Sequence, residues 1–290
     1  MAKSPSHKFG QIIGDLLEEI MEPHFHAFCS GRNLYLDKKG VRQGVRNGKK
    51  VTWLDKFNNE HDLDFVIEKG GSSKHRGRPV AFIEAAWRRY TKHSRNKAQE
   101  IQGAILPICE KHEWDKPFLG AILAGVFTEG SLTQMRSSGF ELVLFPYESI
   151  VSAFASIGIK AGFDEDTPDA EFDDTISKIE TLNHQQWSSL KAHLTESNKA
   201  LLECFFNRLQ DTLDRGIELV VLIPLHGQQN EFQSIDDAIA FITTYDEIGK
   251  FDGQFRKYDA IVKYSNGDRI DASFQDKVKA INFLNYVAGK

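Results

Sequence analysis

Several classes of protein are excluded by what this sequence lacks. No apolar run approaches the roughly 20 residues that a membrane helix needs, and the first ten residues, MAKSPSHKFG, lack the apolar stretch of a secretory signal. The cysteines are odd in number and far apart (Cys29, Cys109 and Cys204), which indicates reduced thiols rather than a disulfide framework. The phosphate loop GxxxxGK[ST] and the serine-hydrolase elbow G-x-S-x-G are both absent. We therefore expect a cytoplasmic protein that contacts no membrane and uses neither nucleotide-driven motion nor a serine nucleophile.

Net charge is small, but the charges are strongly patterned along the chain. A net charge of −5 over 290 residues argues against nonspecific nucleic-acid binding by the whole surface. Residues 31–56 nevertheless hold eight basic side chains, and residues 69–97 hold nine against Glu84 alone. Residues 163–182 hold eight acids and one lysine. Two basic runs around a few acids are typical of a surface that contacts phosphates.

Hydrophobic periodicity predicts an α/β core in the first half of the chain. Helices are expected at 7–28, 94–112, 130–137 and 148–158, and strands at 50–54, 61–68, 80–87, 118–128 and 140–147. The segments 31–50 and 70–79 are rich in glycine and basic residues and are expected to be loops. This order predicts a mixed central sheet flanked by helices on both faces.

The acidic stretch 162–174 is predicted to separate two domains, one at 1–162 and one at 175–290. The second is expected to be a smaller α+β domain with a role in target recognition or dimerisation. Its predicted elements are helices within 174–214 and at 234–245, a strand at 217–225, a hairpin at 257–274 that turns at Asn266-Gly267, and a helix at 275–287.

Two acids of the first domain fall where neighbouring strands would bring them together. In HDLDFVI, Leu63 and Phe65 are expected to share one face of a strand and Asp64 to occupy the other. In VAFIEAAW, Glu84 shares its face with Ala86. If these strands pair, the carboxylates of Asp64 and Glu84 reach one divalent cation. Such a pair, with water and a phosphate oxygen, suits Mg²⁺, or Mn²⁺ in its place, in phosphodiester hydrolysis.

With these residues, the segment from about 8 to 158 resembles the PD-(D/E)XK nuclease superfamily, which includes many restriction endonucleases. The resemblance rests on the order of the elements together with Glu18 in the first helix, Asp64 and Glu84. It implies a restriction-endonuclease-like core and Mg²⁺-dependent cleavage of double-stranded DNA. It also implies that Asp64 and Glu84 are metal ligands and that Glu18 supports the site. Since one sequence leaves the register open, Asp62 could replace Asp64, and Glu19 could replace Glu18.

The sequence departs from that family at Ala86, where the family has lysine. Three explanations stay open. The lysine has moved to the next helix, where Lys97 or Lys92 would serve; or Ala86 is an engineered replacement that silences a toxic enzyme; or the site is inactive and the chain only binds DNA or a partner. The basic residues that follow Glu84 favour the first explanation.

Arginines near the predicted site are the expected DNA contacts. Arg76 and Arg78 belong to the basic loop at 70–79, while Arg88, Arg89 and Arg95 follow the strand that carries the glutamate. Guanidinium groups suit phosphate contacts because their fixed fork matches phosphate oxygens. The loop at 31–50 is expected to approach DNA as well. A duplex has two-fold symmetry, so a homodimer would match it.

Overall fold

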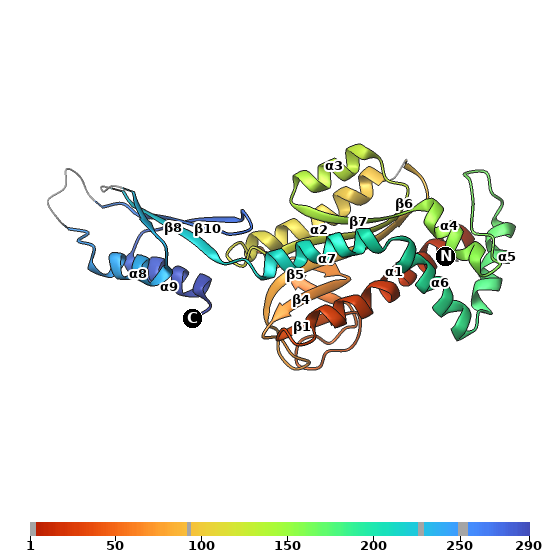
Figure 1. Cartoon of the computed structure of the whole chain (residues 1–290), viewed down its shortest axis with the longest axis horizontal. Helices are drawn as coiled ribbons and strands as arrows, with labels where there is room; N and C mark the ends of the chain where they lie inside the picture. The colour runs from red at the N-terminus through yellow and green to blue at the C-terminus, as the bar shows by residue number, and fades with distance from the viewer. Residues whose placement is uncertain (1–3, 92–93, 226–228, 249–254) are drawn as a thin grey trace. The chain divides into compact units, whose positions relative to one another are not determined.

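The computed structural model describes residues 4–91, 94–225, 229–248 and 255–290 (Figure 1). The chain forms two compact units. The first contains Met1–Lys111 and Pro117–Leu209, and the second contains His112–Lys116 and Gln210–Lys290. Within the described ranges, no helix has both the length and the apolar character that crossing a membrane requires.

A mixed five-stranded sheet forms the centre of the first unit, with strand order β1-β4-β5-β6-β7. The pairs β1–β4 and β4–β5 are antiparallel, whereas β5–β6 and β6–β7 are parallel. The sheet strands are β1 Leu34–Lys38, β4 Phe65–Lys69, β5 Arg78–Arg88, β6 Phe118–Gly125 and β7 Phe140–Pro146. A separate antiparallel hairpin consists of β2 Val51–Leu54 and β3 Glu60–Leu63. The helices up to the end of this unit are α1 Pro5–Cys29, α2 Ser94–Lys111, α3 Glu129–Ser137, α4 Tyr147–Ser156, α5 Asp169–Glu180, α6 His184–Ser197 and α7 Lys199–Leu213.

Helices cover both faces of this sheet, as the periodicity predicts. Figure 1 shows α2 and α3 together on one side and α1 on the other. On the α1 side, Phe25 of the helix packs against Phe65 with ring centroids 5.1 Å apart. The α2 side is a buried apolar cluster that includes Val66, Phe82, Ala86, Ala98, Ile101, Ile105, Leu132 and Met135. The apolar stripe of each helix therefore faces the sheet, and the burial of these stripes stabilises the layers.

Two strand predictions next to Asp64 are wrong in detail. Strand β1 lies within 31–50, which was expected to be a loop, and it pairs with β4 through Leu36 and Ile67. The expected strand at 61–68 is broken by a bend at Asp64, so its first part pairs with β2 and its second part joins the main sheet. The bend interrupts the alternation of side chains. Leu63 consequently joins the cluster on the α2 side, while Phe65 faces α1.

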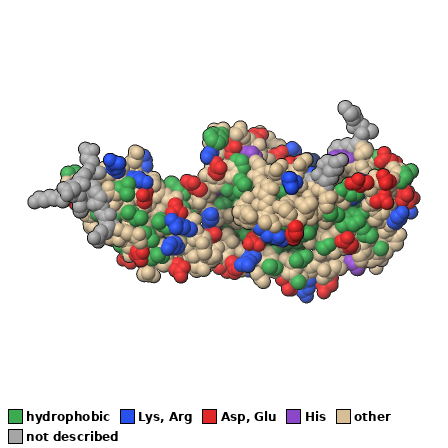
Figure 2. Space-filling model, turned by 90° about the horizontal axis from the view of Figure 1, so that it is seen from above, with side chains coloured by type: hydrophobic (Ala, Val, Ile, Leu, Met, Phe, Trp, Pro, Cys, Tyr) green, Lys and Arg blue, Asp and Glu red, His purple; other side chains and the backbone are tan. Residues whose placement is uncertain are grey.

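The acidic stretch is packed into the first unit, and the division between the units lies near Leu209 rather than within 163–174. Phe163 and Phe172 are buried, with ring centroids 4.1 Å apart, and both contact Phe9 of α1. Tyr147 accepts a hydrogen bond from the Phe163 amide at 2.7 Å and donates one to its carbonyl at 2.9 Å. Figure 2 shows acidic side chains gathered at the end of this unit that carries α5. Phe163 and Phe172 therefore anchor this acidic stretch by packing against Phe9 in the core.

The second unit is an antiparallel four-stranded sheet with helices on one face. Its strand order is β11-β10-β8-β9, with β8 Ile217–Pro224, β9 Asn230–Phe232, β10 Tyr258–Tyr264 and β11 Arg269–Phe274. Helices α8 Ile235–Thr244 and α9 Lys277–Ala288 share a buried cluster with the strands. The hairpin turns at Gly267, whose φ of 88° favours glycine. The predicted α+β class is confirmed. Within this unit, the sequence analysis did not predict the short strand β9.

Candidate active site

Asp64 lies in the bend directly before β4, beside Glu84 on the neighbouring strand β5. The last pair of the β4–β5 ladder is Phe65 with Ile83, so the next residue along each chain is Asp64 on one side and Glu84 on the other. The backbone N–H of Ala85 donates to Oδ2 of Asp64 at 2.7 Å, which ties the aspartate to β5. The bend at Asp64 thus places its carboxylate against the strand that carries Glu84.

Burial raises the pKa of both acids. For Glu84, burial is the main cause and repulsion from Asp64 is the second, and together they raise its pKa well above the ordinary value. Burial also raises the pKa of Asp64, although the hydrogen bond from Ala85 and the charge of Lys97 work in the opposite direction. A pair of partly buried carboxyl groups that repel each other favours a bound cation, which would offset their charges.

Glu18 is the third acid that acts on this pair. Burial, followed by repulsion from Asp64, raises the pKa of Glu18 to about 7. Asp62 and Glu19, which the sequence left open as alternatives to Asp64 and Glu18, form ion pairs elsewhere. Asp62 pairs with Lys50 at 2.5 Å, and Glu19 pairs with Lys191 at 3.2 Å. Asp62 also adds a repulsion that raises the pKa of Glu84, but its own carboxylate is paired with Lys50. Asp64 and Glu18 are the members of each alternative whose carboxyl groups repel each other.

Of the two lysines expected to replace the family lysine, Lys97 lies near the site. Its charge lowers the pKa of both Asp64 and Glu84 from helix α2. Lys92 lies outside the described residues. Ala86 is only 4% exposed and belongs to the cluster on the α2 side. The sequence analysis missed Glu100, which pairs with Lys97 at 3.3 Å, although their spacing of three residues on a helix was the available signal.

The donors of this site are hard oxygen ligands, which suit Mg²⁺ or Mn²⁺. Over the described part of the chain, no group of three or more His, Cys, Asp or Glu side chains is arranged to hold a metal ion. Mg²⁺ commonly binds one or two carboxylates and completes its shell with water and substrate phosphate. Asp64 and Glu84 fit that mode, and the charge of Glu18 acts on both.

The five arginines expected to contact DNA differ in their exposure and in the residues they contact. Arg76 stacks on Trp53 and donates to the Thr52 carbonyl at 3.1 Å. Arg89 lies over the rings of Tyr90 and Phe172.

The other three lie on β5 and α2. Arg78 begins β5 and is partly exposed, and Arg88 ends the same strand with a guanidinium nitrogen 3.6 Å from Glu100. Arg95 is exposed in the first turn of α2. Of the five, Arg95 combines exposure with a position two residues from Lys97.

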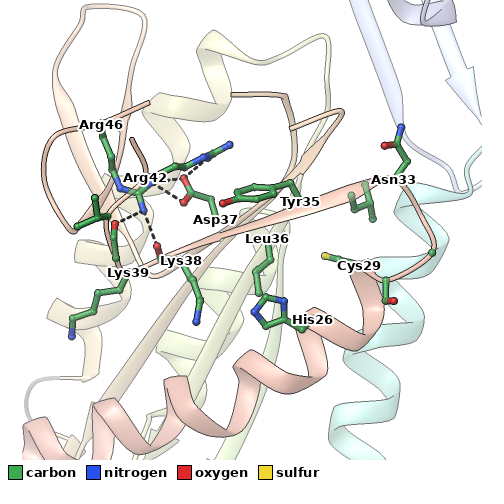
Figure 3. A pocket seen from close by; sticks show the side chains of 15 residues that line it. His26, Cys29, Asn33, Tyr35, Leu36, Asp37, Lys38, Lys39, Arg42 and Arg46 are labelled. Carbon is green, nitrogen blue, oxygen red and sulfur yellow. Dashed lines mark hydrogen bonds and ion pairs between the residues drawn. The ribbon is translucent and has the colours of Figure 1, made fainter. Parts of the chain in front are cut away.

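Two arginines of the basic loop 31–50 are turned into the protein. Figure 3 shows Arg42 and Arg46 beside Asp37, where their guanidinium nitrogens approach Asp37 Oδ2 to 2.7 and 2.6 Å. Arg42 also forms a two-pronged pair with Glu68 at 2.6 and 2.9 Å. All four side chains are at most 8% exposed. These two arginines are thus committed to ion pairs within the fold and do not add to a phosphate-binding surface.

A hollow of about 680 Å³ lies beside this network, along strand β1. His26, Leu36 and Lys39 are among its lining residues, whereas Asp64 and Glu84 are not (Figure 3). Its lining includes the charged side chains of Asp37, Lys38, Lys39, Arg42 and Arg46. Pockets that enclose small-molecule substrates are, by contrast, largely apolar.

Comparisons with protein-family models, with curated protein sequences and with solved structures found no match to this chain.

Proposed function

We propose that this chain is a Mg²⁺-dependent DNA endonuclease of restriction type, with Asp64 and Glu84 as the metal ligands. The observation that carries the proposal is the adjacency of these two partly buried carboxylates with the charge of Lys97 acting on both. When bound, the ion would polarise the scissile phosphate and lower the pKa of the attacking water.

The chain's own groups have separate roles in this proposal. Asp64 and Glu84 would hold the ion, and Glu18, whose pKa is raised to about 7, would add negative charge once deprotonated. The Lys97 ammonium neutralises charge that develops on the phosphate oxygens as water attacks phosphorus and the bond to the leaving oxygen breaks. Exposed cations such as Arg95 hold the duplex through its phosphates.

The proposal is tested by cleavage of supercoiled plasmid and long duplex DNA with Mg²⁺ or Mn²⁺. Asp64→Asn should abolish cleavage. Lys97→Ala should slow it by about 10²–10³-fold with little loss of DNA affinity, because one catalytic charge is removed while other phosphate contacts remain.

Arg95→Ala is the matched control, since it removes a cation from the same helical turn. It should weaken DNA binding modestly and leave the rate of the bound complex unchanged. DNA binding without cleavage under any of these conditions would contradict the proposal. That outcome would favour a nuclease-fold module that recognises DNA or a partner without cutting.

A further inference from the structure

Glu100 connects the proposed catalytic lysine to the strand that carries Glu84. Its Oε2 lies 3.3 Å from the Lys97 amine and 3.6 Å from a guanidinium nitrogen of Arg88. Arg88 is the last residue of β5, and Lys97 lies in the first turn of α2. One carboxylate oxygen therefore joins the end of the strand to the start of the helix.

The Lys97 ammonium forms an ion pair with Glu100, and its charge also acts on the Asp64–Glu84 pair. An ammonium that settled on that pair would neutralise the charge that attracts a divalent cation. The distances to Glu100 exceed those of a strong charged hydrogen bond, so the amine is held near this residue but remains free to turn toward a phosphate.

We propose that Glu100, braced by Arg88, is a positioning residue that keeps the Lys97 ammonium beside the Asp64–Glu84 pair rather than on it, and so leaves the pair open to a divalent cation. The inference rests on the proposed function, because it requires this pair to be the cation site. Glu100 does not touch the ion or the substrate; it acts through Lys97.

Direct binding of Mn²⁺, measured by titration calorimetry without DNA, tests this role independently of activity. Glu100→Gln should weaken Mn²⁺ binding about three- to fivefold, the range expected when a half-exposed ion pair is lost. Glu110→Gln is the matched control. Glu110 lies on the same helix, its side chain is 57% exposed like that of Glu100, and it pairs with Lys56. Its substitution should leave Mn²⁺ affinity unchanged.

A second pair of variants tests whether Glu100 acts by positioning the Lys97 ammonium or by attracting Mn²⁺ directly with its own charge. In a Lys97→Gln background, Glu100→Gln should have no effect on Mn²⁺ affinity, because the amine that Glu100 holds is gone. An equal loss of affinity in both backgrounds would overturn the inference, as would no loss in the unchanged background.

The inference and the proposed function fail in different ways. Mn²⁺ binding that Asp64→Asn weakens, but with no coupling between Glu100 and Lys97, overturns the inference alone. No Mn²⁺ binding, or binding that is insensitive to Asp64→Asn, overturns the proposed metal site and this inference with it. Where DNA is cleaved, higher Mn²⁺ should recover the rate of Glu100→Gln but not that of Lys97→Gln.

Discussion

Replacing Glu68 by glutamine should strongly destabilise the first unit. The Glu68 side chain is fully buried, it forms two hydrogen bonds with the Arg42 guanidinium, and it accepts a third from the Gly77 amide at 2.6 Å. Together with Asp37 and Arg46, the network holds two positive and two negative side chains. Glu68→Gln leaves two buried arginines to share the single carboxylate of Asp37, so one buried positive charge is no longer balanced. Breaking a buried pair from one side costs about 3–5 kcal/mol, which corresponds to a fall in melting temperature on the order of 10 °C.

Scanning calorimetry is the suitable assay, because it resolves separate transitions when the two units unfold independently. The control is Asp62→Asn, which removes an exposed ion pair of 2.5 Å with Lys50 and should shift the transition little. Adding Arg42→Met to Glu68→Gln should recover part of the loss, since Asp37 and Arg46 then remain a balanced pair. If Glu68→Gln is no more harmful than Asp62→Asn, the buried network does not hold the basic loops in place.

Three further outcomes are expected. Mn²⁺ affinity should rise with pH, by about tenfold per pH unit while one proton is displaced, because the raised pKa values of Glu84 and Glu18 keep protons on the metal-free site. By the same linkage, the metal-free chain should lose stability as pH rises from about 4.5 to 7, since the folded state binds more protons than the unfolded state. Calorimetry in two buffers counts the protons released, and equal affinity at pH 6 and 8 would contradict the assignment. Ala86→Lys should cost about 1–3 kcal/mol by overpacking and restore part of the cleavage lost in Lys97→Ala; a gain of cleavage only with Ala86→Lys would instead indicate a silenced enzyme. Phe172→Ala should cost about 3–5 kcal/mol and expose 163–174 to protease, whereas unchanged resistance would show that this ring does not anchor the stretch.

Local patterns in the sequence predicted most elements because each pattern is itself local. Helix α1 shows a long apolar stripe, and the hairpin of β10 and β11 turns at an Asn-Gly pair. Strand β1 escaped prediction because LYLDK is short and lies among glycine and basic residues. Its place is set by pairing with β4, about thirty residues further along the chain. Such pairing leaves little local signal.

The residues of the candidate site could also be predicted only in part from the sequence. The sequence singled out Asp64, Glu84 and Lys97 by residue type and position along their elements. It could not reveal the bend at Asp64, which depends on β3 and β4 joining different sheets. The three-residue spacing of Lys97 and Glu100 could have predicted their ion pair, but not the contact of Glu100 with Arg88 at the end of β5.

Residue order alone predicted most helices and strands and the acids whose spacing lets them meet, because those properties follow from side-chain periods of 3.6 and 2 residues. The tertiary structure decided which charges remain available for a ligand. Arg42 and Arg46 belong to the basic loop that was expected to approach DNA, yet the fold buries them against Asp37 and Glu68. Likewise, the acidic stretch reads as a linker, but Phe163 and Phe172 hold it to α1. Burial and ion pairing depend on residues distant in sequence, so only the folded chain specifies them.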